Sequence, residues 1–319
     1  GRDSPEPSES QESELPLTNT QVEQQQTEAM VMGCFRHFMS KCSNKESDEE
    51  MELMKKEHLS FLMPALYNLP QAWQGLDASR PWFVYWIVHA VDLFGEIENL
   101  IEKEQLADHV GTFLAACQDA EGGFGGGPDQ LPHLAPSYAA IMALAIVGRT
   151  DVVNRDSFYR FLFRVRDEHT GGFRMHEDGE IDMRGTYCAV ASASLLGMIT
   201  DELFADVGDY VKSCQNYDGG IAGERGVEAH GGYSFCGLAA VTILGQANQL
   251  NLDKMLHWCV HRQMSLEGGY QGRTNKLVDS CYSFWQGAAL RVLHEAMRQN
   301  GKQVPEDHCW DDPTPLQLY

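Results

Sequence analysis

Asp279 and Cys281 lie two residues apart in the stretch VDSCYSFW, where an apolar run begins. A carboxylate oxygen and a thiolate sulfur on one helical turn are a reasonable pair of ligands for zinc. The pair also has a simpler interpretation, because aspartate often caps helices and cysteine is among the most frequently buried residue types. Both interpretations place Asp279 and Cys281 at the N-terminal end of a helix.

Cationic residues lie at the starts of several apolar runs. His230 opens the run in EAHGGYSFCG, and Arg184 opens the run in EIDMRGTY. Arg273 and Lys276 directly precede VDSCYSFW, and Tyr282 lies inside it. In a chain with a formal net charge of -22, such donors beside helix N-termini predict a bound anion, and a diphosphate suits them. The alternative is that Arg273 and Lys276 are solvated loop charges.

Aromatic residues occupy the early turns of the same apolar runs. Trp82 and Trp86 are four residues apart, which puts them on one face of a helix. Aromatic stripes most often fill a core, but around a ring of helices they would line a central cavity suited to a long apolar ligand. The other members of the group are Tyr138, Tyr187, Tyr233 and Trp285.

An internal repeat positions these residues. The first glycines of four pairs, Gly122, Gly171, Gly219 and Gly268, are separated by 49, 48 and 49 residues. A fixed period of this size is typical of repeat architectures. Equivalent side chains of successive repeats should therefore face the same part of the molecule.

Each glycine pair separates two kinds of helical pattern. An amphipathic run precedes the pair, which predicts an outer helix, and a run apolar on nearly all sides follows it, which predicts a buried inner helix. A further inner helix begins at Arg80, with Pro81 suited to the first turn. Period-two alternation is weak, so no sheet is expected. The apolar stripe of the fourth outer helix comprises Leu252, Met255, Leu256, Cys259 and Val260.

Repeated pairs of outer and inner helices curl into a solenoid, and a solenoid that closes becomes an α-α toroid with one central cavity. The predicted fold class is therefore all-α, an α-α toroid. The glycine-rich loops would crowd one mouth of the cavity, together with the N-termini of the inner helices. These N-termini favour anions at that mouth.

Composition limits the remaining classes. The acidic balance argues against a nucleic-acid surface, and the acidic tract at residues 1–50 is expected to be disordered. The toroid is expected at residues 51–295 and an irregular tail at residues 296–319. Nine unevenly spaced cysteines without a signal sequence favour a reducing, cytoplasmic location. The longest strongly apolar run is about half of what a membrane span needs.

The long strings around the glycine pairs carry a resemblance. EGGFGGGPDQLPHLAPSYAA, EIDMRGTYCAVASASLL, CQNYDGGIAGERGVEAHGGYSFCGLAA and EGGYQGRTNKLVDSCYSFWQ resemble the β subunits of protein farnesyltransferases, within the prenyltransferase β-subunit family. The resemblance runs from Leu76 to Leu293. It implies an α-α barrel that pairs with a helical-repeat α subunit. It also implies zinc-dependent transfer of farnesyl from farnesyl diphosphate to a cysteine near the C-terminus of an acceptor protein.

The resemblance also implies roles for individual residues. Asp279 and Cys281 resemble two zinc ligands, and Mg²⁺ is a further ion for the diphosphate. His230, Arg273, Lys276 and Tyr282 resemble the diphosphate-binding set. Residues that resemble the lining of the isoprenoid and peptide pockets are Trp82, Trp86, His133, Ala135, Arg184, Tyr187, Gly232, Tyr233, Cys236 and Trp285.

The chain departs from the family toward its C-terminus. The family's third zinc ligand is a histidine in a later segment with no counterpart here, and neither His294 nor His308 has the matching context. The family's magnesium-associated acidic residue lies in the same missing part. About five of the family's six hairpins are expected, which predicts weak zinc binding and little activity for this chain alone. The resemblance implies that the bulky Trp82 favours a fifteen-carbon isoprenoid, because the related type I geranylgeranyltransferases have a smaller residue at this position.

Other functions stay open. A geranylgeranyltransferase β subunit is the alternative within the same enzyme class. A terpene cyclase would share the barrel, but the D-x-D-D run of protonation-initiated cyclases does not occur in the sequence. A truncated, non-catalytic repeat scaffold would explain the toroid but not the constellation of Asp279, Cys281, Arg273 and Lys276.

Overall fold

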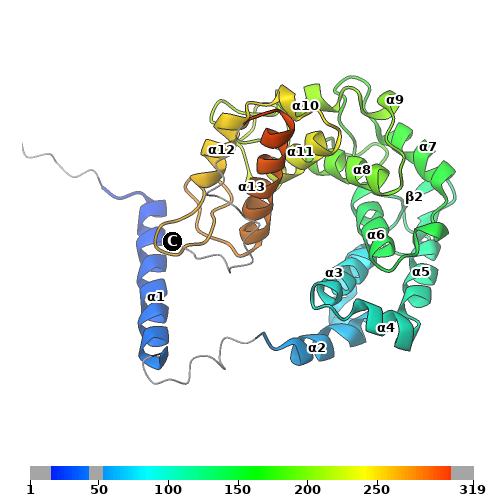
Figure 1. Ribbon diagram of the computed structural model, residues 1–319, viewed down its shortest axis with the longest axis horizontal. Helices are drawn as coiled ribbons and strands as arrows, with labels where there is room; N and C mark the ends of the chain where they lie inside the picture. The colour runs from blue at the N-terminus through cyan, green and yellow to red at the C-terminus, as the bar shows by residue number, and fades with distance from the viewer. Residues whose placement is uncertain (1–15, 43–52, 303–319) are drawn as a thin grey trace, which may run out of the picture.

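The computed structural model describes residues 16–42 and 53–302, whose helices form an open ring (Figure 1). Five inner helices follow one another around the central space, and each packs against the next in chain order. All but the last are buried along most of their length, as predicted for an inner layer, whereas the last is buried on one side only. They are α3 (Arg80–Leu93), α6 (Leu134–Ile146), α8 (Met183–Leu195), α11 (Gly231–Ile243) and α13 (Cys281–Gln299).

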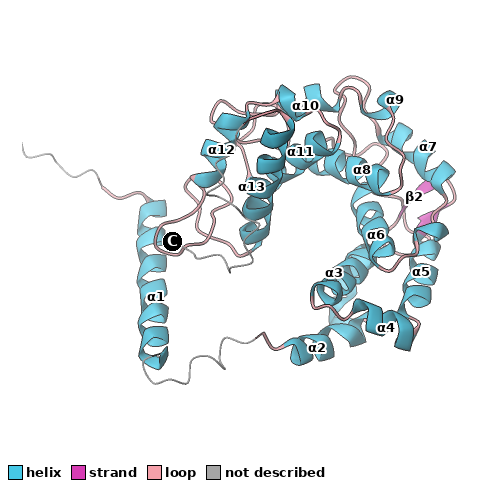
Figure 2. Ribbon diagram, in the orientation of Figure 1, coloured by secondary structure: helices cyan, strands magenta, loops and turns pink. Residues whose placement is uncertain are grey.

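Outer helices cover the inner ones on the convex side of the ring (Figure 2). The four expected from the repeats are α5 (Leu106–Cys117), α7 (Arg155–Val165), α10 (Val207–Ser213) and α12 (Leu252–Val260). Shorter helical segments complete the connections: η2 (Gln71–Ser79), α4 (Ile97–Glu104), η3 (Thr150–Val152), α9 (Asp201–Phe204) and η4 (Ala247–Gln249). The repeat of outer and inner helices read from the glycine spacing is thus confirmed.

The apolar stripes of the outer helices form the core, with one exception. Leu252, Met255 and Cys259 of α12 are buried as predicted, but Leu256 and Val260 are 38% and 46% exposed. The prediction that these two residues are buried is wrong. Their counterparts in the preceding repeat are buried against the next repeat, whereas no described repeat follows α12.

Close backbone packing explains the paired glycines. Gly219 has a φ of +105°, and a β-carbon added there would lie 2.1 Å from the backbone oxygen of Lys254 in the next outer helix. Gly122 has the same relation to Ser157 in α7. At Gly268 a β-carbon would meet nothing within 4 Å, because no further outer helix lies against it among the described residues. The glycine pairs therefore mark the places where one repeat packs against the next.

The chain contains a small amount of sheet that the sequence did not predict. β1 (Gln118–Asp119) pairs antiparallel with β2 (Gly122–Phe124), and single bridges such as Arg166 to Phe173 recur at the other glycine pairs. These contacts are too short to give a period-two pattern. They hold the glycine turns closed beneath the outer helices.

Within the tract at residues 1–50, the structure corrects the expectation of disorder for residues 19–42. Residues Asn19–Cys42 form the helix α1, which lies across the open side of the ring, and α2 (Lys55–Tyr67) leads into η2 (Figure 1). Nε2 of Gln24 in α1 donates to Oε1 of Glu267, 2.6 Å away in the last described repeat. A helix can form in this tract because residues 27–42 contain little acidic charge and several Met and Phe side chains. The helix α13 also extends past the expected boundary at residue 295.

The rest of the predicted N-terminal tract and C-terminal tail, with His308, lies outside the described residues. None of the helices in residues 16–42 and 53–302 combines the length and apolar character that a bilayer crossing requires.

Candidate active site

One residue caps each of the inner helices α6, α8, α11 and α13 at the same mouth of the ring. The caps are His133, Asp182, His230 and Asp279, whose separations of 49, 48 and 49 residues repeat the glycine spacing. The side chain of each accepts a hydrogen bond from a backbone N–H two residues later, at 3.0, 2.8, 3.1 and 3.0 Å. The fold therefore brings four polar side chains to equivalent places around one opening.

Three predicted site residues, His230, Tyr282 and Arg273, lie close together at the mouth. Nε2 of His230 lies 2.8 Å from the hydroxyl of Tyr282 in the first turn of α13. Nη1 of Arg273 lies 2.6 Å from Oε2 of Glu228, two residues before His230. The positive charge of Arg273 reaches the imidazole and helps to lower its pKa, after the larger effect of burial. Residues 45 and 52 positions apart thus meet at the mouth.

The hydrogen bonds of His230 indicate its tautomer. Nδ1 accepts from the N–H of Gly232, so in the neutral ring the proton resides on Nε2. The lowered pKa favours the neutral ring near pH 7. Nε2 then donates to the oxygen of Tyr282, which leaves the Tyr282 hydroxyl proton free to point toward a ligand. Burial raises the pKa of Tyr282, so this proton is retained.

The remaining predicted cations are placed differently from one another. Lys276 is exposed in the loop between Arg273 and α13, and no ion pair or hydrogen bond joins it to another described residue. Arg184 is held by its helix cap: Nε donates to Asp182 at 3.0 Å, and Nη2 forms a second bond to the same carboxylate. Glu180 lies 3.7 Å from Arg184. Arg184 is therefore held by its own helix cap, whereas Lys276 is exposed to solvent.

Asp279 and Cys281 lie together at the N-terminus of α13. The N–H of Cys281 donates to the carboxylate of Asp279, and this bond and one from the thiol lower the pKa of Asp279. Partial burial and the adjacent carboxylate raise the pKa of the Cys281 thiol. The two exposed donors fit zinc in type. They do not suffice in number, because no third His, Cys, Asp or Glu of the described residues joins them.

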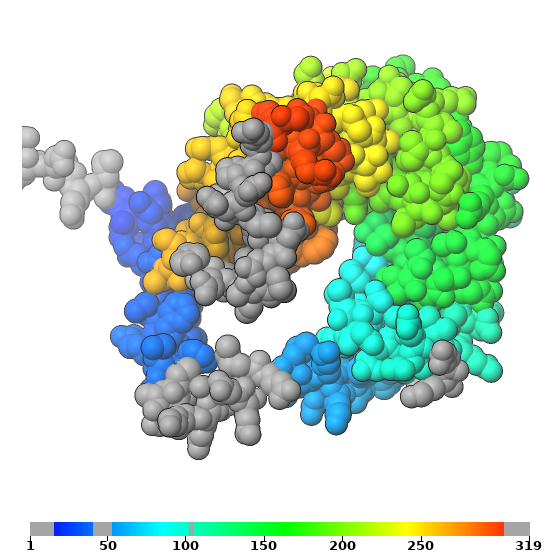
Figure 3. Space-filling model, in the orientation of Figure 1, coloured from blue at the N-terminus to red at the C-terminus, as the bar shows by residue number. Residues whose placement is uncertain are grey.

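A ladder of aromatic rings follows the inner helices. Successive centroids in the series Tyr85, Tyr138, Tyr187, Phe235 and Phe284 are 5.9, 5.5, 5.4 and 5.2 Å apart. The last four positions are separated by 49, 48 and 49 residues, so they are equivalent in the repeat. The hollow within the ring is visible in Figure 3, between the cyan residues of the first inner helix and the orange residues of the last repeat.

The predicted pocket residues gather around this ladder. Trp82 lies 5.6 Å from Trp86 and 5.8 Å from Tyr138, measured between ring centroids. Trp285 lies 5.5 Å from Phe235 at the other end. Trp82 and Trp285 are half-buried, whereas Trp86 is 54% exposed. The indoles are therefore positioned to extend the apolar surface at both ends of the ladder.

The other predicted residues divide between the mouth and the wall. His133 and Ala135 form the cap of α6, and the His133 ring lies 5.5 Å from that of His176. Tyr233 lies 5.4 Å from His230. Cys236 is buried, which raises the pKa of its thiol and makes it a wall residue without nucleophilic character.

Sequence reasoning missed several members of this site. Glu228 and Asp182 hold the two arginines, and Phe235 rather than Tyr233 occupies the ladder position. Gly272 packs against the Tyr282 ring, since a β-carbon there would lie 2.0 Å from it. The repeat spacing would have identified Asp182 and Phe235, but no local signal pointed to Glu228 or Gly272.

Comparison with known proteins agrees with this fold. Residues 53–317 match the prenyltransferase alpha-alpha toroid domain. The chain is 45% identical over 291 residues to protein farnesyltransferase subunit beta of Arabidopsis thaliana, covering 90% of this chain and 59% of the relative. It is 28% identical over 280 residues to the geranylgeranyl transferase type-1 subunit beta of the same plant, covering 78% and 74%. The chain therefore spans little more than half the length of its farnesyltransferase relative.

A solved structure has the same fold. Candida albicans protein geranylgeranyltransferase-I complexed with GGPP matches with a TM-score of 0.63 and 22% identity, over 76% of this chain and 77% of that one. At this identity the match concerns the fold alone. From the domain match and the higher identity to the farnesyl branch, the chain belongs to the prenyltransferase α-α toroid family, together with the farnesyltransferase β subunits.

Proposed function

We propose that this chain is the β subunit of a heterodimeric, cytoplasmic protein farnesyltransferase. The observation that carries the proposal is the cluster of His230, Tyr282 and Arg273 beside an aromatic ladder. The cluster offers donors to a diphosphate, and the ladder offers an apolar wall to the isoprenoid attached to it. A geranylgeranyltransferase β subunit is the runner-up, with lower identity to this chain.

The reaction proposed is the transfer of a farnesyl group to sulfur. The cysteine thiolate of an acceptor protein's C-terminal peptide attacks C1 of farnesyl diphosphate, and a carbon–sulfur bond forms. The bond between C1 and the diphosphate oxygen breaks, and the diphosphate leaves with the electron pair. Tyr282, Arg273 and Lys276 stabilise the charge that grows on the leaving oxygens.

The three donors differ in the contacts that they hold before a diphosphate binds. His230 holds the hydroxyl of Tyr282 with its proton directed outward. Arg273 is paired with Glu228 and must share or exchange this partner when a diphosphate enters. Lys276 is exposed and joins without breaking a contact. The aromatic ladder excludes water from the isoprenoid, which strengthens these electrostatic contacts.

Zinc is the metal we propose for Asp279 and Cys281. When bound, zinc lowers the pKa of a coordinated thiol, so an acceptor cysteine is a thiolate at neutral pH. Its further ligands would come from outside the described residues. An α subunit and Mg²⁺ for the diphosphate complete the proposed assembly.

Binding measurements on the chain with its α subunit would test the proposal. We expect farnesyl diphosphate to bind, and Arg273→Met to weaken it about tenfold, because a hydrogen-bonded charge is lost. Farnesol binding should change little. The matched control is Arg225→Met, another loop arginine, whose Nε bonds Ser213. Equal affinity of the wild type for farnesol and farnesyl diphosphate would contradict the diphosphate site.

The choice of isoprenoid needs a separate measurement. Farnesyl and geranylgeranyl diphosphate would compete for the same complex. Preference for the fifteen-carbon chain is expected, since Trp82 packs against Tyr138 and limits the space for the isoprenoid there. Preference for twenty carbons would favour the runner-up.

A further inference from the structure

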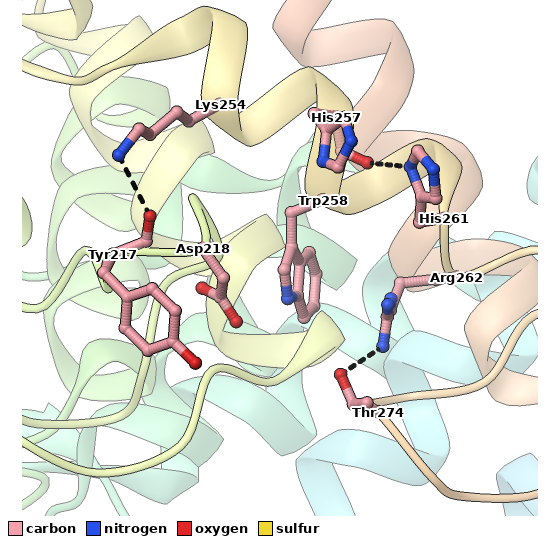
Figure 4. Close-up of a pocket in the computed structure, with 8 residues that line it drawn as sticks. All are labelled: Tyr217, Asp218, Lys254, His257, Trp258, His261, Arg262 and Thr274. Carbon is pink, nitrogen blue, oxygen red and sulfur yellow. Dashed lines mark hydrogen bonds between the residues drawn. The ribbon is translucent and has the colours of Figure 1, made fainter.

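A second cleft, of about 450 Å³, lies on the outer side of the ring. Figure 4 shows it between α12 and the loops of the third and fourth repeats. Its position differs from that of the proposed active site, because none of the capping residues or ladder residues lines it. The lining residues are Tyr217, Asp218, Lys254, His257, Trp258, His261, Arg262 and Thr274.

A buried arginine, Arg262, distinguishes this cleft. It is 8% exposed, the only arginine classed as buried among residues 16–42 and 53–302. Nη1 donates to Gln271 at 3.0 Å and to Thr274 at 2.7 Å, and the guanidinium lies 5.2 Å from the centre of the Trp258 ring. All these partners are neutral. Nε of Arg262 has no hydrogen-bond partner in the described part of the chain.

A buried cation without a counter-ion is unusual in a protein. Buried charges are generally paired, because an unpaired one keeps its desolvation cost. Other arginines that line the repeats have carboxylate partners, such as Arg166 with Asp206 at 2.7 Å and Arg174 with Asp167 at 2.7 Å. No carboxylate of the described residues lies within 4.0 Å of Arg262. The carboxylates of Asp218 and Glu228 act on the guanidinium only from beyond contact distance, so it lacks the direct negative partner that a buried cation usually has.

The rest of the cleft adds one lysine and one carboxylate. Nζ of Lys254 bonds a backbone oxygen, that of Tyr217, at 3.1 Å and has no ion pair among the described residues. Asp218 is the single carboxylate of the lining, and it accepts from the N–H of Gly220 at 3.2 Å.

Two histidines complete the rim. His257 and His261 are one helical turn apart, and their rings are stacked with centroids 4.0 Å apart. Nδ1 of His261 donates to the backbone oxygen of His257 at 2.7 Å, so Nε2 is the nitrogen left for a ligand. An imidazole in its protonated form donates to an oxyanion. The adjacent charges of Lys254 and Arg262 oppose a metal cation at this histidine pair.

We propose that the cleft binds a free oxyanion of the phosphate class, which serves as the counter-ion of Arg262. Arg262 and Lys254 supply the charge, and the two imidazoles add donors in their protonated form. Thr274 lies between Arg273 and Lys276 in the chain, so an anion on Arg262 also steadies the loop that carries the proposed diphosphate donors. The site is separate from farnesyl transfer, since none of its lining residues belongs to the proposed catalytic set.

Calorimetric titration of the full chain with inorganic phosphate, against sodium chloride at equal ionic strength, tests the site. Saturable binding of one phosphate is expected. Arg262→Gln should weaken it about tenfold, because a charged donor is lost. Lys254→Met and His261→Gln, both at exposed positions, should each weaken it about threefold without affecting folding. These two variants keep the test valid if Arg262→Gln fails to fold.

Two matched variants complete the design. Lys212→Met removes one exposed lysine charge outside the cleft and should leave phosphate affinity unchanged. Lys276→Met should also leave it unchanged. The proposal is overturned if phosphate binds no better than chloride, or if Lys212→Met weakens binding as much as Lys254→Met. It is also overturned if Lys276→Met abolishes binding while Lys254→Met does not, since the anion would then occupy the diphosphate site.

Discussion

His230 uses its two ring nitrogens for different tasks. Nδ1 caps α11 through the N–H of Gly232, and Nε2 orients the hydroxyl of Tyr282. A single side chain therefore both ends a loop and prepares a donor for a ligand. His133 repeats the first task at α6, where it caps through Ala135. The imidazole ring of His230 thus serves both the cap of α11 and the orientation of the Tyr282 hydroxyl.

Removing the hydroxyl of Tyr282 tests the second task. We expect Tyr282→Phe to weaken farnesyl diphosphate binding about tenfold, because one charge-assisted hydrogen bond is lost. The ring and its packing against Gly272 remain, so farnesol binding should not change. Tyr159→Phe is the control, because the Tyr159 hydroxyl bonds Thr200 at 2.9 Å and belongs to an outer helix. Equal losses in both variants would mean that Tyr282 supports only stability.

The cap at His133 predicts a dependence of stability on pH. Burial, and then the nearby His176, lower its pKa from the ordinary 6.5, so the unfolded chain binds more protons than the folded one as pH falls below 6.5. This contribution to the free energy of unfolding is complete above pH 6.5 and is lost toward lower pH. His133→Asn keeps a cap but cannot titrate. Urea unfolding should show a smaller loss of stability between pH 7.5 and 5 in the variant; an unchanged loss would contradict the prediction.

Among the secondary-structure elements, a buried hydroxyl ties each of the inner helices α6, α8 and α11 to its glycine turn. Ser137, Thr186 and Ser234 accept from the N–H groups of Phe124, Phe173 and Ile221, at 2.8, 3.3 and 2.9 Å. Their separations of 49 and 48 residues follow the repeat. The turn and the helix that it precedes are therefore fixed as one unit. Ser283 is the equivalent residue in α13, and it is exposed.

This difference predicts unequal costs for the same substitution. Ser234→Ala leaves the buried N–H of Ile221 without a partner and should lower the free energy of unfolding by about 1–3 kcal/mol. Ser283→Ala should change it by less than about 0.5 kcal/mol, as is usual for surface positions. Chemical denaturation of both variants provides the comparison. A similar cost for the two would show that the fourth repeat is tied in the same way as the third.

At the scale of the whole molecule, the ring has an uncovered apolar edge. Leu256, Val260 and Phe284 are exposed on the last two helices, although their counterparts in the preceding repeat, Val207, Val211 and Phe235, are buried. Each repeat covers the apolar side of the one before it, as in other repeat folds. Phe284 ends the aromatic ladder for the same reason, with 54% of its surface exposed against 6% for Phe235.

The uncovered edge predicts a contrast between two equivalent phenylalanines. Phe235→Ala should cost about 3–5 kcal/mol of stability, as expected for a buried aromatic residue. Phe284→Ala should cost less than about 1 kcal/mol, because most of the ring already contacts water. Thermal unfolding of the purified chain at low concentration is a suitable measurement. A comparable cost at Phe284 would mean that another surface covers this edge in solution.

The repeat could be predicted from the sequence because glycine spacing and helical periodicity are local in the chain. The inner helices from α3 to α13, the outer helices and the cluster at His230 and Tyr282 follow from them. The helix α1 was missed because its acidic surroundings outweighed its short apolar stretch. Glu228 was missed because a loop carboxylate has no periodic signal.

The number, order and facing of the helical pairs follow from the amino-acid sequence, because these depend on the periodicity of apolar residues and on glycines where one backbone meets the next. The pairing of charges follows only from the folded arrangement. Arg273 meets Glu228, 45 residues away, and Arg166 meets Asp206, 40 residues away, while Arg262 is buried beside neutral partners. Ion pairing depends on distances of a few ångströms between side chains far apart in the chain, and such distances exist only once the ring has curved.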